Sequence, residues 1–101
     1  MKNIKVGLVA GRHSMPVDGY IFDEIKDVLD FDFLDNGVKK FISSLPVVDV
    51  KLDCNLDIYV TGLTSVTISL LSNLKDLKFD KGQVKFYHFD RDTNTYKPQI
   101  I

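Results

Sequence analysis

Two continuous apolar runs in the sequence have the pattern of strands in the middle of a parallel sheet. The first covers residues 4–10, where Lys5 is the only charged residue, and the second covers residues 56–60, where Asp57 is the only charged residue. Strands that are covered on both faces read as near-continuous apolar runs. Gly7, inside the first run, indicates a close approach by another element or a ligand. We therefore predict two central strands at these positions.

Apolar residues recur at helical spacing in three other stretches of the chain. In the first, Ile21, Ile25, Val28 and Leu29 stand at positions i, i+4, i+7 and i+8. Side chains at this spacing share one face of a helix. The pattern predicts a short helix over residues 20–29.

The other two helical patterns flank the second central strand. One predicts a helix over residues 38–45 that ends before Pro46, preceded by a turn at residues 35–37. The longer one follows the second strand, and Thr61 or Thr64 is the expected N-cap. Its apolar face consists of Leu63, Val66, Ile68, Leu70, Leu71, Leu74 and Leu77.

Three more segments have the pattern of extended chain. Residues 47–52 alternate apolar and charged side chains, which is typical of an edge strand or of an extended lead-in to the next strand. Residues 84–89 and 96–100 predict two strands joined as a hairpin by a polar loop. Pro98 lacks a backbone N–H, so the last strand is expected at an edge of the sheet.

These elements together predict the class of fold. With 101 residues the chain forms one domain, residues 1–101. Strands that alternate with helices favour an α/β fold with a small, mainly parallel sheet flanked by helices in two or three layers. The C-terminal β-hairpin adds antiparallel pairing or projects toward a partner.

Composition and charge restrict the partners. The formal net charge is −1, so there is no overall basic field to hold long DNA or RNA. Cys54 is the single cysteine, which excludes an internal disulfide and fits a reducing cytoplasm. No apolar stretch approaches the roughly 20 residues that cross a bilayer. We therefore expect a cytoplasmic protein without a membrane segment.

Two short polar loops are the strongest candidates for a functional site. Gly11, Arg12, His13 and Ser14 follow the first central strand. The second loop follows the other central strand and consists of Thr61, Gly62, Leu63 and Thr64. In parallel sheets ligands bind beyond the carboxyl ends of the strands, between neighbouring loops. A cation, an imidazole, hydroxyls and the N–H groups of a helix N-terminus together predict a site for a phosphate-bearing ligand.

Each loop also has a purely structural interpretation. The first is equally well explained as a surface loop that caps the following turn. The second is read more readily as an ordinary strand-to-helix junction, because it matches neither a Walker A loop nor the dinucleotide-binding glycine motif. Each loop alone is weak evidence for a site, and the two loops together are stronger evidence.

The remaining polar and aromatic residues point to no further chemistry. Asp30, Asp32 and Asp35 are interpreted as solvated carboxylates along a strand edge, since their spacing does not fit an EF-hand. We therefore predict no metal and no cofactor. His88 is expected to be a hydrogen-bonded core or interface residue. The side chains that could line a groove for a base, or simply pack the hairpin, are Tyr87, Tyr96 and Gln99.

Short motifs across most of the chain resemble a known family. The first strand ends in Ala-Gly-Arg-His at residues 10–13, and the second leads into Tyr-Val-Thr-Gly-Leu-Thr at residues 59–64. The C-terminal part contains Phe-Tyr-His-Phe-Asp-Arg at residues 86–91 and Tyr-x-Pro-Gln at residues 96–99. This combination resembles the small single-domain CARF-like (CRISPR-associated Rossmann fold) proteins of type III CRISPR systems and their phage counterparts. Residues 30–55 match no motif of that family.

The resemblance implies a Rossmann-like fold and a homodimer that binds a cyclic oligoadenylate second messenger. Its ligand would contact both polar loops, Gly11 to Ser14 and Thr61 to Thr64. Some members cleave the ring without a metal, by attack of a ribose 2′-OH on the adjacent phosphate. Arg12 would then stabilise the charge and His13 would transfer a proton, with Lys85 or Arg91 adding charge. Sequestration without cleavage fits these residues equally well.

Two other classes of function are open from the residues alone. One is an enzyme that acts on a nucleotide or a sugar phosphate in the same crevice. The other is a small phage or plasmid protein that inhibits a host protein through the aromatic hairpin. Changes at Arg12 and Thr61 would abolish function in the ligand-binding case, and changes at Tyr87 or Tyr96 in the inhibitor case.

Overall fold

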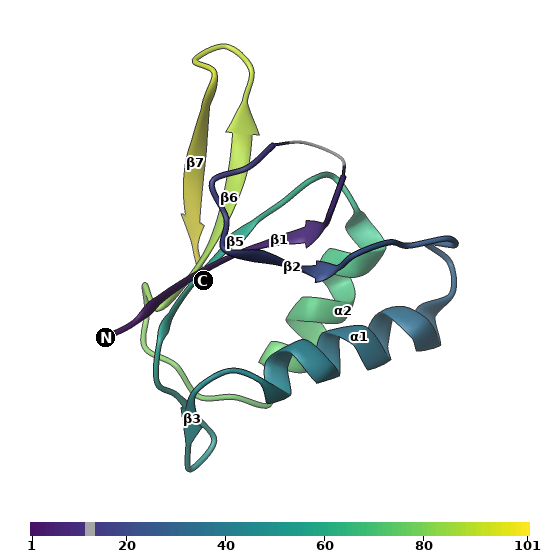
Figure 1. Ribbon diagram of the computed structural model, residues 1–101. Coiled ribbons are helices and arrows are strands. Elements are labelled where there is room, and N and C mark those ends of the chain that lie inside the picture. Colours follow the sequence, from purple (N-terminus) through teal and green to yellow (C-terminus); the bar gives the residue numbers. More distant parts are fainter. Residues whose placement is uncertain (12–13) are drawn as a thin grey trace.

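A computed structural model shows a five-stranded sheet and two helices, and it describes residues 1–11 and 14–101 (Figure 1). The strand order in the sheet is β2-β1-β5-β6-β7. The first four strands of that order run parallel, and β7 is antiparallel to β6. The elements are β1 (Asn3–Val9), β2 (Gly19–Phe22), α1 (Phe31–Ser43), β3 (Val47–Val48), β4 (Lys51–Leu52), β5 (Asn55–Tyr59), α2 (Thr64–Leu74), β6 (Val84–Asp90) and β7 (Thr95–Ile100). The prediction of an α/β fold with a mainly parallel sheet is confirmed.

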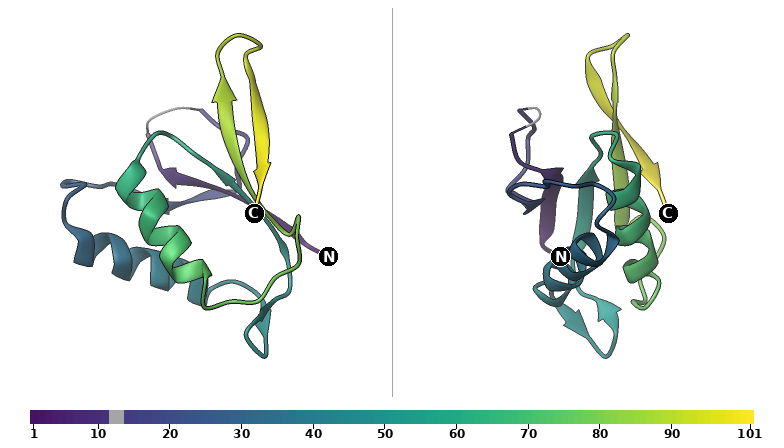
Figure 2. Two further views of the ribbon diagram at one scale, coloured as in Figure 1. Left: turned by 180° about the vertical axis from the view of Figure 1, so that it is seen from behind. Right: turned by 90° about the vertical axis from the view of Figure 1, so that its right-hand side faces the viewer.

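Both helices cover the same face of the sheet, which makes a two-layer arrangement (Figures 1 and 2). The connections β2-α1-β5 and β5-α2-β6 move in the same direction across the sheet. Because such crossovers are almost always right-handed, both must place their helix on one side. Of the two-layer and three-layer arrangements that the sequence left open, the structure has the two-layer one.

The core lies between the sheet and the helices. Alternate residues of the three central strands point toward the helices and are buried: Val6, Leu8, Leu56, Ile58, Val84 and Phe86. The helices contribute Leu34, Val38, Val66, Leu70 and Leu74 to the same cluster. On the opposite face, one row across the sheet consists of Lys5, Asp57 and Lys85, and the next contains Tyr20, Gly7, Tyr59 and Tyr87.

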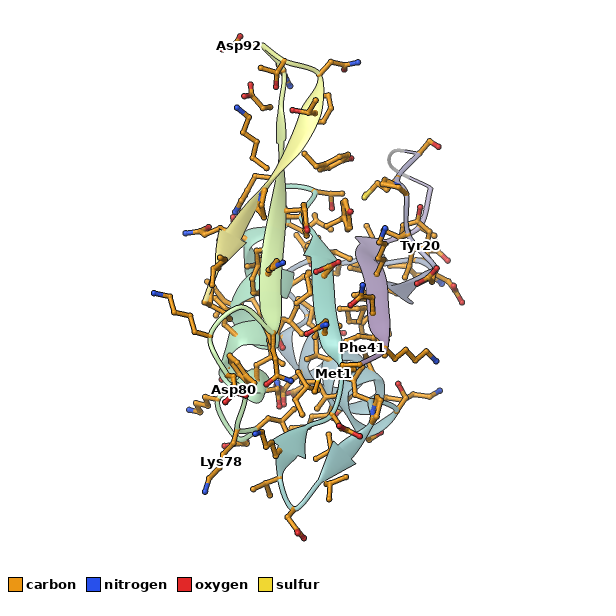
Figure 3. The ribbon with its side chains drawn as sticks, turned by 90° about the vertical axis from the view of Figure 1, so that its left-hand side faces the viewer. Met1, Tyr20, Phe41, Lys78, Asp80 and Asp92 are labelled. Atoms are coloured by element: carbon orange, nitrogen blue, oxygen red, sulfur yellow. The ribbon has the colours of Figure 1, made fainter. Side chains whose placement is uncertain are left out.

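Gly7 allows a close contact on the face without helices. A Cβ at this position would lie 2.7 Å from the Tyr20 ring, which crosses over Gly7 from the edge strand β2. Figure 3 shows Tyr20 beside β1 at this edge of the sheet. The predicted close approach at Gly7 is confirmed, and its cause is an aromatic side chain of the protein itself.

The helix predicted over residues 20–29 is wrong. Residues 19–22 instead form β2, and no regular helix or strand covers residues 23–30. The N–H of Ala10 donates to the carbonyl of Phe22 at 2.9 Å, and the Phe22 side chain is buried. Pairing with β1 therefore outweighs the helical spacing of the apolar residues, and Leu29 is left exposed.

The next helix begins earlier than predicted. Asp30 is the N-cap of α1, and its carboxylate accepts from the N–H of Phe33 at 3.2 Å. The interpretation of residues 30–35 as a strand edge is therefore wrong, and so is the turn at residues 35–37. Gly37 lies inside the helix. Its lack of a side chain makes room for the ring of Phe22, with which a Cβ at this position would collide.

Residues 47–52 fold into their own short hairpin. β3 and β4 pair antiparallel, separate from the main sheet. Asp49 and Val50 turn the chain with φ angles of 50° and 59°. The alternating pattern predicted one edge strand or an extended lead-in, and the turn inside it carries no glycine or proline that would have revealed it.

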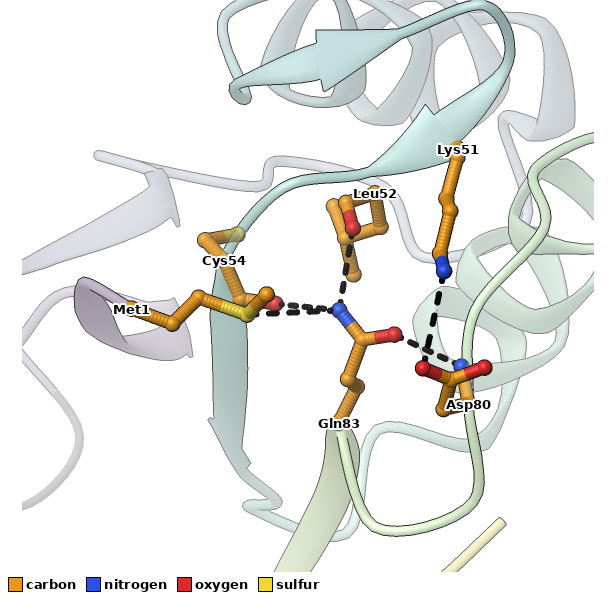
Figure 4. Close-up of polar contacts among 6 residues, drawn as sticks. All are labelled: Met1, Lys51, Leu52, Cys54, Asp80 and Gln83. Atoms are coloured by element: carbon orange, nitrogen blue, oxygen red, sulfur yellow. Dashed lines mark hydrogen bonds and ion pairs between the residues drawn. The ribbon is translucent and has the colours of Figure 1, made fainter.

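A buried glutamine organises the amino end of the sheet (Figure 4). The Gln83 side-chain amide donates to the carbonyls of Leu52 and Cys54 at 2.9 and 3.0 Å. Its oxygen accepts from the N–H of Asp80 at 2.6 Å. One side chain thus connects the end of β4, the start of β5 and the turn before β6.

Among the described residues, no helix is both long and apolar enough to span a membrane.

Candidate functional site

The carboxyl ends of the parallel strands surround a pocket of about 580 Å³. Its walls come from three segments that are far apart in the sequence. They are the chain after β1, the junction between β5 and α2, and the β6–β7 arm, which we define as residues 84–100. The lining residues are Ser14, Val60, Thr61, Gly62, Phe89, Arg91, Asn94 and Tyr96.

The first polar loop reaches this pocket through Ser14. Gly11 has a φ of 83°, a backbone conformation that favours glycine, and it turns the chain away from the end of β1. Arg12 and His13 lie outside the described residues, so their predicted roles rest on the sequence alone. Ser14 nevertheless places the chain that follows them next to the second loop.

The second polar loop contributes Thr61 and Gly62. Gly62 has a φ of 77°, which favours glycine, and this bend directs the backbone into α2. Leu63 is the N-cap of α2 and no side chain caps the helix, so the prediction of Thr61 or Thr64 as the cap is wrong. The first N–H groups of the helix therefore lack a side-chain acceptor at the cap position.

Leu63 and Thr64, which were predicted to contact the ligand, do not line this pocket. The Leu63 side chain is buried in the core. Thr64 is exposed at the start of α2 and lines a neighbouring depression instead of the pocket. Of the four residues of the second loop, only Thr61 and Gly62 lie in the pocket wall.

The Thr61 hydroxyl is the one unusual polar atom of this region. Within the described part of the chain, its Oγ1 is buried and has no hydrogen-bond partner. A buried hydroxyl without a partner costs free energy, and such groups are rare in folded proteins. A ligand with a hydrogen-bonding group at this point would remove that cost.

The β6–β7 arm supplies pocket side chains that lie outside the two polar loops. Arg91 adds a guanidinium, and Asn94, whose φ is 55°, adds an amide at the turn of the arm. Figure 3 shows Asp92 at the end of this arm. The sequence predicted Arg91 as a source of additional charge and Tyr96 as a groove residue, but it predicted no role for Asn94. A signal for Asn94 existed, since asparagine is one of the residues that tolerate positive φ in turns.

Aromatic rings form the base of the arm next to the pocket. Tyr59 and Tyr87 stack with ring centroids 4.7 Å apart, and Tyr96 meets Tyr59 edge-on at 5.0 Å. Phe89 meets Tyr96 edge-on at 5.2 Å. Burial, more than the neighbouring tyrosines and Asp57, raises the pKa of Tyr59. Phe89 and Tyr96 thus form an aromatic wall of the pocket, and the contact of Tyr96 with Tyr59 holds this wall against the sheet.

The predicted groove of Tyr87, Tyr96 and Gln99 does not form. Gln99 pairs with Phe86 in the sheet, so it points to the face opposite Tyr87 and Tyr96. There its Oε1 lies 2.8 Å from Nε2 of His88. His88 is hydrogen-bonded as expected, but it is exposed.

Two of the three aspartates at residues 30–35 make structural contacts, and Asp32 lies in the first turn of α1. Asp30 caps α1, as described above, and Asp35 connects the two helices. Its Oδ1 accepts from Nδ2 of Asn73 at 2.7 Å, and its Oδ2 lies 3.0 Å from Nζ of Lys39. Asn73 first and Lys39 second lower the pKa of Asp35. Cys54 is buried, and that burial raises the pKa of its thiol.

Among the described residues, the pocket wall therefore combines the Arg91 guanidinium, the Asn94 amide, Thr61 with its unpartnered hydroxyl, and two aromatic rings. A guanidinium binds phosphate, and aromatic rings stack on a flat ring. No protein-family model matches the chain, and no curated protein or solved structure is similar to it.

Proposed function

We propose that this protein binds a cyclic oligonucleotide, a cyclic oligoadenylate, in the pocket at the carboxyl ends of its strands. The observation that carries the proposal is that Ser14, Thr61 and Arg91, from three separate segments, line one pocket. Its volume of about 580 Å³ is in the usual range for small-molecule sites. A parallel sheet with its ligand loops at this edge is also the arrangement expected of a Rossmann-like fold that ends in a hairpin.

Phosphate groups are the part of the ligand that the polar side of the pocket would hold. Arg91 is suited to bidentate hydrogen bonding with phosphate oxygens. The backbone at Gly62 lies in the same wall, without a side chain that would block the close approach of a ligand. The Thr61 hydroxyl gains the partner that it lacks in the free protein.

The base is the part that the opposite wall would hold. Phe89 is partly exposed, and Tyr96 is anchored by its edge-on contact with Tyr59. Aromatic side chains stabilise a base by stacking, and this is worth roughly 1–3 kcal/mol per base. The Asn94 amide is both a donor and an acceptor, which suits the edge of an adenine.

Two outcomes of binding follow from the same site. The protein sequesters the ring, or it cleaves it without a metal. In cleavage the ribose 2′-OH attacks the adjacent phosphorus, a 2′,3′-cyclic phosphate forms, and the 5′-oxygen leaves with a proton. Arg12 would stabilise the charge on phosphorus and His13 would transfer the proton, as the resemblance implies.

One depletion experiment tests the proposal. Purified protein is mixed, without metal, with cyclic tri-, tetra- and hexa-adenylate and with cyclic dinucleotides, and free ligand is measured by chromatography. Ligand that disappears and returns intact after the protein is digested indicates sequestration. Ligand that returns as linear fragments indicates cleavage. If no cyclic oligoadenylate is depleted, the proposal is wrong and the arm becomes the candidate surface for a protein partner.

A further inference from the structure

The outer surface of the two helices exposes a group of large apolar side chains, which we name the helix-face patch. It consists of Val28, Leu29, Phe31, Ile68 and Leu71, whose exposed fractions range from 39% for Val28 to 68% for Leu29. The first four line a single depression of about 660 Å³ next to the start of α2. Contiguous apolar surface of this kind marks an interaction site in a protein that is stable in water.

The helix at the centre of this patch carries no charge. Residues 64–74 contain no aspartate, glutamate, lysine, arginine or histidine. The outward side of a surface helix is normally charged. Here the exposed residues of α2 are Thr64, Ile68, Leu71 and Ser72. A neutral stripe can pack against a copy of itself without placing like charges together.

The patch is also held in a fixed shape. Ser65 Oγ donates to the carbonyl of Val28 at 2.9 Å, which attaches the chain before α1 to the first turn of α2. Asp35 joins α1 to Asn73 near the other end of α2. The apolar side chains from two separate segments therefore form one preformed surface, and little ordering is needed on association.

Charges of opposite sign lie at the two ends of the patch. The end where α1 and α2 begin is mainly acidic. It carries one lysine, Lys26, and five acidic residues: Asp23, Glu24, Asp27, Asp30 and Asp32. The end where the helices finish is mainly basic. It carries one acidic residue, Asp76, and four lysines: Lys39, Lys40, Lys75 and Lys78. A second copy turned by a two-fold axis across α2 would place each acidic end against a basic end.

We propose that the helix-face patch binds a second copy of this chain, with the two α2 helices antiparallel across a two-fold axis. The neutral centre would be buried, and the charged ends would pair at the rim. The starts of the two α2 helices would then lie about one helix length, ~16 Å, apart along the helix axis.

The oligomeric state of the ligand-free full-length chain tests the proposal. The wild type is expected to be a dimer in sedimentation velocity and light scattering. Ile68→Lys is expected to weaken dimerisation at least about tenfold, because it buries a charge at the centre. The matched control is Val48→Lys, since Val48 in β3 is exposed to the same 61% as Ile68 and lies outside the patch. Circular dichroism verifies that both variants fold.

Each other result would overturn the inference. A monomeric wild type would mean that a different partner covers the patch. An Ile68→Lys variant that remains dimeric would mean that the copies meet elsewhere. Equal weakening by Ile68→Lys and Val48→Lys would show a nonspecific effect of charge. Because no ligand is present, none of these results depends on the proposed function.

The orientation is tested by exchanging charges at the ends. Lys75→Glu is expected to weaken the dimer, and adding Asp32→Lys to the same chain is expected to restore it. In an antiparallel pair the new glutamate faces the new lysine of the second copy. No rescue by the double variant would overturn the antiparallel arrangement.

Discussion

The two ends of the sheet differ in how their buried polar atoms are satisfied. At the amino end, Gln83 is only 7% exposed and its amide is bonded to two carbonyls and one N–H. At the carboxyl end, the Thr61 hydroxyl is buried without a partner in the described part of the chain. The first end uses its polar groups within the fold, and the second leaves a hydrogen-bonding group unused.

Backbone conformation does not distinguish the two ends. Positive φ occurs at the amino end in Val50 and Gly82, and at the carboxyl end in Gly62 and Asn94. The hydrogen-bonding status of buried groups is therefore the feature that distinguishes the two ends. Four predictions test this contrast.

The largest effect is expected at the amino end, for Gln83→Leu. The substitution leaves the carbonyls of Leu52 and Cys54 and the N–H of Asp80 without their partner. We expect the free energy of unfolding to fall by about 3 kcal/mol. Urea denaturation followed by circular dichroism measures it, and Gln99→Leu on the exposed face is the matched control. A loss no larger than that of Gln99→Leu would remove the contrast.

Arg91→Ala tests the carboxyl end through ligand binding. Removing the guanidinium is expected to weaken binding of a cyclic oligoadenylate about tenfold, ~1.4 kcal/mol, without changing stability. Isothermal titration calorimetry measures the affinity. Lys81→Ala is the control, because it removes the same charge at the turn before β6. Unchanged affinity in Arg91→Ala would show that the ligand binds elsewhere.

Thr61→Val is expected to act in opposite directions on stability and binding. Valine has the shape of threonine without the unpartnered hydroxyl, so the free energy of unfolding should rise by about 1 kcal/mol. Ligand affinity should fall, since a hydrogen-bonding group is lost. Thermal and urea unfolding give the first quantity and calorimetry the second, with Thr64→Val as the exposed control. A variant less stable than the wild type would show that Thr61 has a partner within the protein.

The smallest effect is expected from the acidity of Asp90 in the arm. Lys97, at 3.2 Å, and then the N–H of Asp92 lower the pKa of Asp90. Because the folded-state pKa lies below the unfolded one, this stabilisation exists above the unfolded pKa and is lost as pH falls through the folded pKa. Asp90→Asn should therefore be less stable than the wild type at neutral pH and equally stable in strong acid. A difference that does not change with pH would contradict the assignment.

Sequence patterns predicted the elements that are long and strongly apolar. β1, β5, α2 and β6 lie where the runs and spacings placed them, within a few residues. The errors in helices and strands fall in residues 20–37 and 47–52, where the patterns are short. Ile21, Ile25 and Val28 satisfy a helical spacing, but Phe22 is buried beside β1 and against Gly37. Contacts between distant segments determine the secondary structure of these residues, and the local spacing of apolar side chains does not predict such contacts.

The sequence by itself determined the α/β class, the positions of the central strands along the chain and the two polar loops that follow them. Those properties depend on neighbouring residues, through apolar periodicity and the turn chemistry of glycine. Only the tertiary structure decided which residues meet in the pocket. Arg91, Asn94 and Tyr96 line the same pocket as Thr61 because β6 pairs with β5 and the arm extends beyond it. The pairing and twist of whole strands create that contact, and no local pattern specifies it.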